Sequence, residues 1–228
     1  MPDTCLIVMV KCPEKGKVKN RLSRSIGEEN AVEIYRRSAL DFLDTLDAIM
    51  YPQFDVLIGY YPPDASDCID SWIGTKWKKI PQLGNDLGEK QASLLKQAFE
   101  CGYSAACVTT SDSPDIPAGR FKDAVEKLSR WESVIGPSTD GGYFLLGFTK
   151  DAFYETPFLD MVWSHPGVAN DMKNRLARLG TRWTETEPWP DVDNVADLKA
   201  LLARHPKGFG RVNEPKRTMS FLRRLDLP

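Results

Sequence analysis

The sequence predicts an α/β domain in which helices cover a mostly parallel β-sheet. Short apolar runs of strand length alternate along the chain with longer stretches whose apolar residues recur at helical spacing. Polar clusters rich in carboxylates and glycines follow directly after two of the apolar runs. The alternation is typical of a parallel sheet covered by helices, and polar clusters at strand ends are where such sheets bind ligands.

The first half of the chain supplies three strands and two helices. Strands are expected at Thr4–Val10, Phe54–Tyr61 and Ala105–Thr109, and helices at Glu28–Met50 and Leu87–Cys101. The longest helix has an apolar stripe at helical spacing, made of Ala31, Ile34, Tyr35, Ser38, Phe42, Leu46 and Ile49. The order strand, helix, strand, helix, strand predicts parallel pairing with crossover helices.

The next stretch continues the alternation. A helix carrying Phe121, Val125 and Leu128 is expected after Pro117, whose fixed φ suits the start of a helix. A fourth strand is expected at Ser133–Ile135, followed by a further apolar segment at Tyr143–Phe148. These elements complete a mostly parallel sheet with helices on its faces.

Beyond Lys150 the alternation weakens. The clearest elements there are a helix at Gly167–Leu179, a strand with a loop between 181 and 190, and a short helix after Asn194. The basic tail at 208–228 is interpreted as an amphipathic helix with a solvated face. Because no repeat or linker interrupts the chain, residues 1–228 are predicted to form a single domain.

Composition limits the classes of ligand and location. The chain has 228 residues and a formal charge of −2, too small to indicate a field directed at nucleic acid. No apolar run approaches membrane-spanning length, and the N-terminus lacks the features of a signal peptide. We therefore expect a cytoplasmic protein without a membrane span or a nucleic-acid partner, and the sequence leaves its oligomeric state open.

The cysteines and histidines indicate neither a disulfide framework nor a structural zinc site. The five cysteines form no C-x-x-C pair, and their odd number argues against a disulfide framework. Cys12 is the cysteine nearest the expected site, and a packing role is predicted for it. Only two histidines are present, neither near a cysteine pair, which argues against structural zinc.

Two motifs after strands carry the chemistry. The first is S-D-S-P-D-I-P at Ser111–Pro117, where Asp112 is placed to hold a divalent metal that in turn holds phosphates. The second is G-P-S-T-D-G-G-Y at Gly136–Tyr143, where Asp140 is a possible base for an acceptor hydroxyl. The alternative for the second motif is a tight turn in which Asp140 is only a turn residue.

A lysine-rich loop follows the first strand directly. The segment from Lys11 to Leu22 reads K-C-P-E-K-G-K-V-K-N-R-L and contains four lysines, one arginine, Pro13 and Gly16. It is neither a P-loop nor a dinucleotide fingerprint, because both glycine patterns are absent. Its position predicts phosphate binding by Lys11, Lys19 and Arg21, whereas a lysine-rich loop taken alone is usually a solvated surface.

These motifs resemble those of a bacterial family of glycosyltransferase-like, nucleotide-diphospho-sugar transferase proteins of the DUF2064 type. The first loop resembles K-x-P-x-x-G-x-V-K-T-R-L, and the other matching blocks follow in the same order: Asp86–Glu89, Ser111–Pro117, Gly136–Phe148, Trp163–Ser164 and Asp191–Leu198. The chain departs from the pattern at Asn20 and Asn194, where the family has threonine, and at Lys90-Gln91, where it has Arg-Met. These departures bear on fine specificity.

The resemblance implies a three-layer α/β/α sandwich of the GT-A superfamily, a metal site and two substrate sites. Asp112 and Asp193 would bind Mg²⁺ or Mn²⁺, and the residues in catalytic roles would be Lys19, Arg21, Asp112 and Asp140. The residues assigned to binding the nucleotide and the second substrate are Lys11, Pro13, Gly16, Lys19, Arg21, Asp86, Lys90, Gly141, Gly142, Tyr143 and Trp163. For Trp163 the alternative is a core aromatic, and for Asp191 and Asp193 a polar turn ahead of a helix.

Three functional hypotheses follow. The first is a metal-dependent transferase that takes a nucleotide-diphospho-sugar and a small-molecule acceptor. The second is a nucleotidyltransferase that joins an NTP to a phosphorylated acceptor and releases pyrophosphate, similar to the 2-phospholactate guanylyltransferases. The third is a non-catalytic nucleotide-binding protein, which the retained aspartates disfavour.

Overall fold

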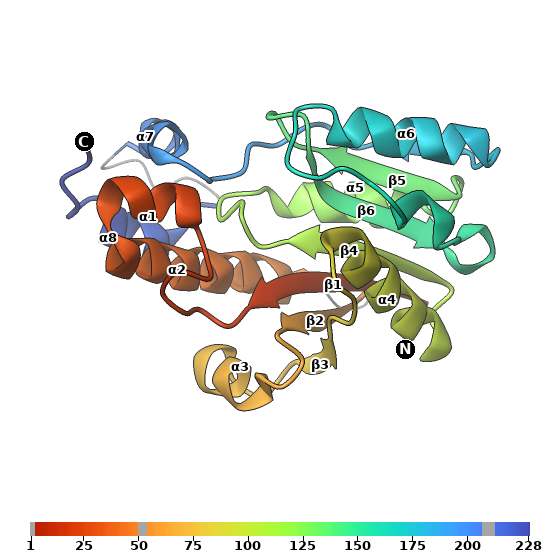
Figure 1. The fold of residues 1–228 in the computed structure, drawn as a ribbon, viewed down its shortest axis with the longest axis horizontal. Coiled ribbons are helices and arrows are strands. Elements are labelled where there is room, and N and C mark those ends of the chain that lie inside the picture. The colour runs from red at the N-terminus through yellow and green to blue at the C-terminus, as the bar shows by residue number, and fades with distance from the viewer. Residues whose placement is uncertain (1–2, 50–53, 207–212) are drawn as a thin grey trace.

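A computed structural model describes residues 3–49, 54–206 and 213–228 (Figure 1). Its centre is a seven-stranded sheet with the strand order β3-β2-β1-β4-β6-β5-β7. Strand β6 is antiparallel to both of its neighbours, and the other adjacent strands pair in parallel. The expected mostly parallel sheet is therefore confirmed.

The described elements have the following bounds. The strands are β1 (Thr4–Lys11), β2 (Asp55–Tyr61), β3 (Lys78–Pro81), β4 (Ala105–Thr110), β5 (Ser133–Pro137), β6 (Tyr143–Thr149) and β7 (Trp183–Glu185). The helices are α1 (Asn20–Ile26), α2 (Glu28–Asp47), α3 (Ser66–Ile73), α4 (Leu87–Glu100), α5 (Ala118–Lys127), α6 (Val168–Arg178), α7 (Val195–Arg204) and α8 (Lys216–Leu222). Short 3-10 turns lie at Lys150–Ala152 and Thr156–Phe158.

Strand β1 is buried on both faces, which creates three layers. Alternate side chains of a strand point to opposite faces. Leu6, Val8 and Val10 therefore join a core cluster that includes residues of α2, α3 and α5. Cys5, Ile7 and Met9 join a second cluster that includes residues of α4 and α6. Helices on both faces of one sheet confirm the predicted three-layer α/β/α sandwich (Figure 1).

Most expected elements appear within a few residues of their predicted bounds. The long helix ends at Asp47, and Met50, which had been included in it, lies outside the described residues. Asn194 caps α7 through a capping box with Asp197, as its polar side chain predicts. The elements that had not been expected are α1, α3, β3 and the 3-10 turns.

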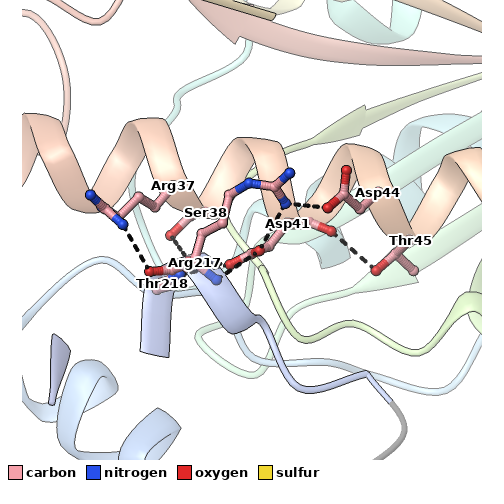
Figure 2. A network of polar contacts seen from close by, with 7 residues as sticks. All are labelled: Arg37, Ser38, Asp41, Asp44, Thr45, Arg217 and Thr218. Carbon is pink, nitrogen blue, oxygen red and sulfur yellow. Dashed lines mark hydrogen bonds and ion pairs between the residues drawn. The ribbon is translucent and has the colours of Figure 1, made fainter. Parts of the chain in front are cut away.

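The C-terminal helix α8 is held by a carboxylate from α2 (Figure 2). The helix has no side-chain cap of its own. Instead, the buried Asp41 accepts hydrogen bonds from the Arg217 and Thr218 backbone N–H groups, at 3.1 and 2.8 Å, and from the Thr218 hydroxyl at 2.8 Å. The Arg217 side chain also pairs with Asp44 on the next turn of α2. These contacts satisfy N–H groups that a helix start leaves unpaired.

A third apolar cluster joins the elements around this contact. It contains residues of α1, α2, α7 and α8, among them Leu22, Ile34, Leu198 and Leu222. Figure 1 shows these helices gathered at one end of the molecule. The expected amphipathic tail helix is thus confirmed for the part that the structure describes, and residues 207–212 lie outside it.

The packing role predicted for Cys12 is wrong, because this residue forms a disulfide bond. Cys12, at the start of the lysine-rich loop, is bonded to Cys68 on α3, with Cα atoms 6.2 Å apart. The odd cysteine count is compatible with this bond, since the remaining three are free and Cys5 and Cys107 are buried. The bond ties the loop to α3.

Within the described residues, no helix is both long and apolar enough to cross a membrane.

Candidate active site

Two adjoining cavities lie at the edge of the sheet where the parallel strands end. The first, of about 570 Å³, is lined by residues that follow β1, β3 and β4. The second, of about 380 Å³, is lined by residues of the β5–β6 turn and of the 163–168 segment. Both cavities include Arg21, Thr110, Ser164 and Asp193 in their walls, so a ligand in one touches residues of the other.

Lys19 lies between two of the predicted metal ligands. Its Nζ donates a 2.8 Å hydrogen bond to Oδ1 of Asp193 and a 2.7 Å bond to the Val192 carbonyl, and it also forms an ion pair with Asp112. Its side chain is only 5% exposed. Burial by itself would lower the pKa of Lys19, but the two carboxylates outweigh that effect and raise it. The ammonium therefore stays charged at neutral pH.

The backbone of this region brings the two aspartates together. Asp112 follows β4, and its carbonyl accepts a 3.0 Å hydrogen bond from the backbone N–H of Val192. Asp193 precedes α7, whose Asp197 accepts from the Asp193 N–H at 2.9 Å. Burial opposes ionisation of Asp193, yet Lys19 lowers its pKa by charge and hydrogen bonding. Two residues 81 positions apart thus both contact the Lys19 ammonium.

Asp191 extends this acidic cluster and had been assigned no functional role. Burial, followed by the charges of Asp140, Asp193 and Asp112, raises its pKa to about 7. The D-V-D spacing was the available signal, because alternate residues of an extended segment point the same way. Asp112, Asp140 and Asp193 line the two cavities, and Asp191 lies close enough to all three for their charges to raise its pKa.

The donor set fits a magnesium or manganese ion. Among the described residues, no group of three or more His, Cys, Asp or Glu side chains is arranged to bind a metal. Mg²⁺, however, is usually held by one or two carboxylates together with water and substrate phosphates. Asp112 and Asp193 already converge on one cation, the Lys19 ammonium, which is the arrangement that such a metal requires.

The first cavity is cationic. Lys11, Lys17 and Lys90 line it together with Lys19 and Arg21. The Lys90 ammonium lies 4.1 Å from the centre of the Tyr61 ring, which is a cation–π contact. These side chains come from the lysine-rich loop and the start of α4, as the phosphate-binding prediction requires.

Gln82 and Tyr35 line the same cavity and had not been predicted as site residues. Gln82 donates from Nε2 to the Val10 and Gly59 carbonyls, at 3.0 and 2.7 Å. The Tyr35 hydroxyl accepts from the Lys11 N–H at 2.8 Å, which fixes the start of the loop. Nothing in the local sequence marked them, since both act through partners that are distant along the chain.

Three residues expected at the site lie outside both cavities. Pro13, Gly16 and Gly141 do not line either cavity. Gly141 has φ +94°, and a Cβ there would lie 1.9 Å from the Pro166 carbonyl oxygen, so only glycine fits. Asp86 lines the first cavity and also caps α4, accepting from the Glu89 N–H at 2.8 Å.

The second aspartate of the S-D-S-P-D-I-P motif has a supporting role. Asp115 has a side chain only 1% exposed, and it accepts a 2.8 Å hydrogen bond from Nε of Arg204. It also lies 3.1 Å from Nε2 of His205 and accepts from the indole N–H of Trp189 at 3.3 Å. This network packs the motif against α7 and the segment that carries Asp193.

Two solved structures share the fold of this chain at low sequence identity. The chain shares its fold with a nucleotidyl transferase from Methanothermobacter thermautotroptrophicus (TM-score 0.58, 14% identity, 88% of this chain and 96% of that chain). It also shares it with the 4-diphosphocytidyl-2C-methyl-D-erythritol synthase of Anaerococcus prevotii DSM 20548 (TM-score 0.57, 11% identity, 85% and 94%). At these identities the likeness concerns the fold alone.

The family follows from closer matches. The model of "Uncharacterized protein conserved in bacteria (DUF2064)" matches residues 45–165. The crystal structure of the "putative nucleotide-diphospho-sugar transferase from Desulfovibrio desulfuricans G20" has a TM-score of 0.88 and 31% identity, over 98% of both chains. The chain belongs to the DUF2064 family. None of the curated proteins matches it.

Proposed function

We propose that this protein is a metal-dependent transferase that uses a nucleotide-activated donor, a nucleotide-diphospho-sugar. The observation that carries the proposal is a cationic cavity whose edge holds two converging aspartates and which adjoins a second cavity. The cationic cavity would bind the phosphates, the two aspartates would bind a divalent metal, and the second cavity would hold the acceptor. The likeness to a nucleotide-diphospho-sugar transferase over nearly the whole chain supports the same class.

The donor diphosphate would occupy the first cavity. Lys11, Lys17 and Lys90 supply positive charge along its wall, and Arg21 reaches the junction with the second cavity. Arginine can bind a phosphate through two parallel N–H groups, so Arg21 would orient the phosphate next to the sugar. Asp112 and Asp193 would hold the metal at the same junction.

The transfer step would take place where the cavities meet. The acceptor oxygen would form a bond to the anomeric carbon while the bond from that carbon to the phosphate oxygen breaks, and the nucleoside diphosphate would leave. Arg21 and Lys19 would stabilise the charge that accumulates on the leaving group. Asp140 would take the proton of the acceptor hydroxyl. Mg²⁺ or Mn²⁺, when bound, supplies further neutralisation of the diphosphate.

One observation keeps nucleotidyl transfer as the second function. Five cationic side chains line the first cavity, a number that suits a triphosphate as well as a sugar nucleotide. In that reaction the acceptor oxygen would attack the α-phosphorus and pyrophosphate would leave. The two reactions therefore differ in the released product.

The test is a thermal-shift screen of the four NTPs, UDP-glucose and GDP-mannose, each with and without MnCl₂. Wild type is compared with Asp112→Asn and with Asp151→Asn, an exposed aspartate outside both cavities. A ligand at about 100 times its Kd stabilises the native state by roughly 2.7 kcal/mol. We expect a manganese-dependent rise in Tm for wild type and Asp151→Asn, and its loss in Asp112→Asn.

The products then separate the two functions. Release of nucleoside diphosphate from a sugar nucleotide supports glycosyl transfer, whereas release of pyrophosphate from an NTP supports nucleotidyl transfer. No shift with any nucleotide, or the same shift in Asp112→Asn, would contradict both.

A further inference from the structure

The two cavities differ in charge although they share a wall. Five cationic side chains line the first cavity against the carboxylates of Asp86, Asp112 and Asp193. The second cavity contains Arg21, the carboxylates of Asp140 and Asp193, and the imidazole of His165, whose Nε2 lies 3.2 Å from the Asp171 carboxylate. Arg21 also borders the first cavity, where the donor phosphates would engage it. A phosphate or carboxylate placed in the second cavity would therefore face two like charges and a shared cation.

Asp140 is fixed so that one oxygen remains available. Its Oδ1 accepts hydrogen bonds from the Ser138 hydroxyl at 2.5 Å and from the Gly142 N–H at 3.0 Å. Among the described residues no hydrogen bond reaches Oδ2. The backbone below is also held, because the Gly141 carbonyl accepts from the Ala169 N–H at 3.0 Å. A fixed carboxylate oxygen in a cavity wall accepts a hydrogen bond from a ligand hydroxyl and repels an anion.

The wall of the second cavity also carries two aromatic side chains. The Trp163 and Tyr143 rings meet edge to face, with centroids 6.4 Å apart. The Tyr143 hydroxyl donates to Oε1 of the buried Gln91 at 2.6 Å, which leaves the Gln91 amide N–H groups as donors. Trp163 also packs against Gly88, where any Cβ would lie 2.9 Å from its ring. The wall thus offers an apolar ring face beside hydrogen-bonding groups.

From this contrast we infer that the acceptor is an uncharged, hydroxyl-rich ring, a neutral sugar or cyclitol, rather than a phosphorylated or carboxylated molecule. The C–H face of such a ring packs on the Trp163 indole, because both surfaces are apolar. Its hydroxyls donate to Asp140 and accept from Gln91. The inference rests on the proposed function for its biological meaning, but the charge and shape of the second cavity can be tested separately.

The test is saturation-transfer NMR on the full chain with MgCl₂, with and without UDP. The probes are methyl β-D-glucopyranoside, myo-inositol and glucose 1-phosphate. With UDP occupying the first cavity, we expect at least one neutral probe to bind at least tenfold more tightly than glucose 1-phosphate. Trp163→Ala should weaken that binding at least tenfold, whereas Trp131→Ala, which removes an exposed tryptophan outside both cavities, should leave it unchanged.

Asp140→Asn provides a variant that keeps the turn, because an amide oxygen can accept the same bonds from Ser138 and Gly142. It should bind glucose 1-phosphate at least threefold more tightly than wild type does. Equal or tighter binding of glucose 1-phosphate by wild type in the presence of UDP, no binding of either neutral probe, or neutral binding that survives Trp163→Ala would overturn the inference. Signals of UDP report the donor cavity independently, so a silent UDP with bound neutral probe counts against the proposed function alone.

Discussion

Replacing Lys19 with methionine tests whether its ammonium occupies the metal position. The ammonium pairs with Asp112 and Asp193, whose side chains are 32% and 37% exposed, while its own is 5% exposed. Breaking a fully buried ion pair costs about 3–5 kcal/mol, and the partial exposure of the carboxylates reduces this to about 2 kcal/mol here. We expect Lys19→Met to lower the free energy of unfolding by that amount in metal-free buffer.

The same substitution should strengthen metal binding. In wild type Mn²⁺ must displace the ammonium from both carboxylates, whereas in Lys19→Met it meets two unneutralised carboxylates. A gain of about 1.4 kcal/mol corresponds to tenfold in Kd, and we expect at least this much. The assays are urea unfolding and titration of Mn²⁺ followed by electron paramagnetic resonance, both without nucleotide.

Lys17→Met is the matched control, since Lys17 lines the same cavity and no ion pair with either aspartate is found for it. Its Mn²⁺ affinity should equal that of wild type. If Lys19→Met binds Mn²⁺ no more tightly than wild type, the two carboxylates are not the metal position and the argument fails.

Three further predictions concern stability. Asp41→Ala should lower the free energy of unfolding, measured in urea, by about 2–3 kcal/mol, because N–H groups at the start of α8 lose their acceptor. Asp44→Asn, which removes the exposed ion pair with Arg217, should lower it by at most about 0.5 kcal/mol. Equal losses in the two variants would refute the capping role. Because the pKa of Asp191 is raised from 3.8 to about 7, the wild type loses stability as the pH rises between those values. Asp191→Asn should therefore stabilise the protein by about 1 kcal/mol at pH 8, allowing for solvent screening, and should have no effect near pH 4. A difference in thermal unfolding that does not depend on pH would contradict this. Reduction of the Cys12–Cys68 bond should lower stability by up to about 4 kcal/mol, the chain-entropy value for its separation of 56 residues, and Cys68→Ser should behave like the reduced wild type in the same unfolding assay.

Strands and long helices could be predicted from the sequence because their signals are local. The apolar run from Thr4 to Val10 and the helical stripe from Ala31 to Leu46 carry their own period, and Asn194 carries its own cap. Strand β3 lacks such a signal: its K-K-I-P is only four residues long and half of them are lysines, and it forms because β2 offers a paired edge. Helix α3 is only eight residues long and was missed for a similar reason.

The sequence predicted which residues line the candidate site better than it predicted which of them contact one another. Asp112, Asp140 and Asp193 come from recognisable motifs, and each lines a cavity. The pairing of Lys19 with Asp193 could not be predicted, because it depends on a backbone φ of 47° at Lys19 and on a residue 174 positions away. The disulfide escaped prediction for a different reason, since a count of cysteines says nothing about which two lie within bonding distance.

The antiparallel strand β6 acts as a spacer between two parallel strands. It separates β4, which delivers Asp112, from β5, which leads to Asp140. Neighbouring strands lie about 4.8 Å apart, so the two strand ends are offset by roughly 10 Å. A sheet with β5 directly beside β4 would halve that offset and bring Asp112 and Asp140 into one pocket. The reversed strand thus sets the spacing between the sheet ends that lead to Asp112 and to Asp140, and for the proposed transfer a linked bisubstrate inhibitor would need a bridge of about this length.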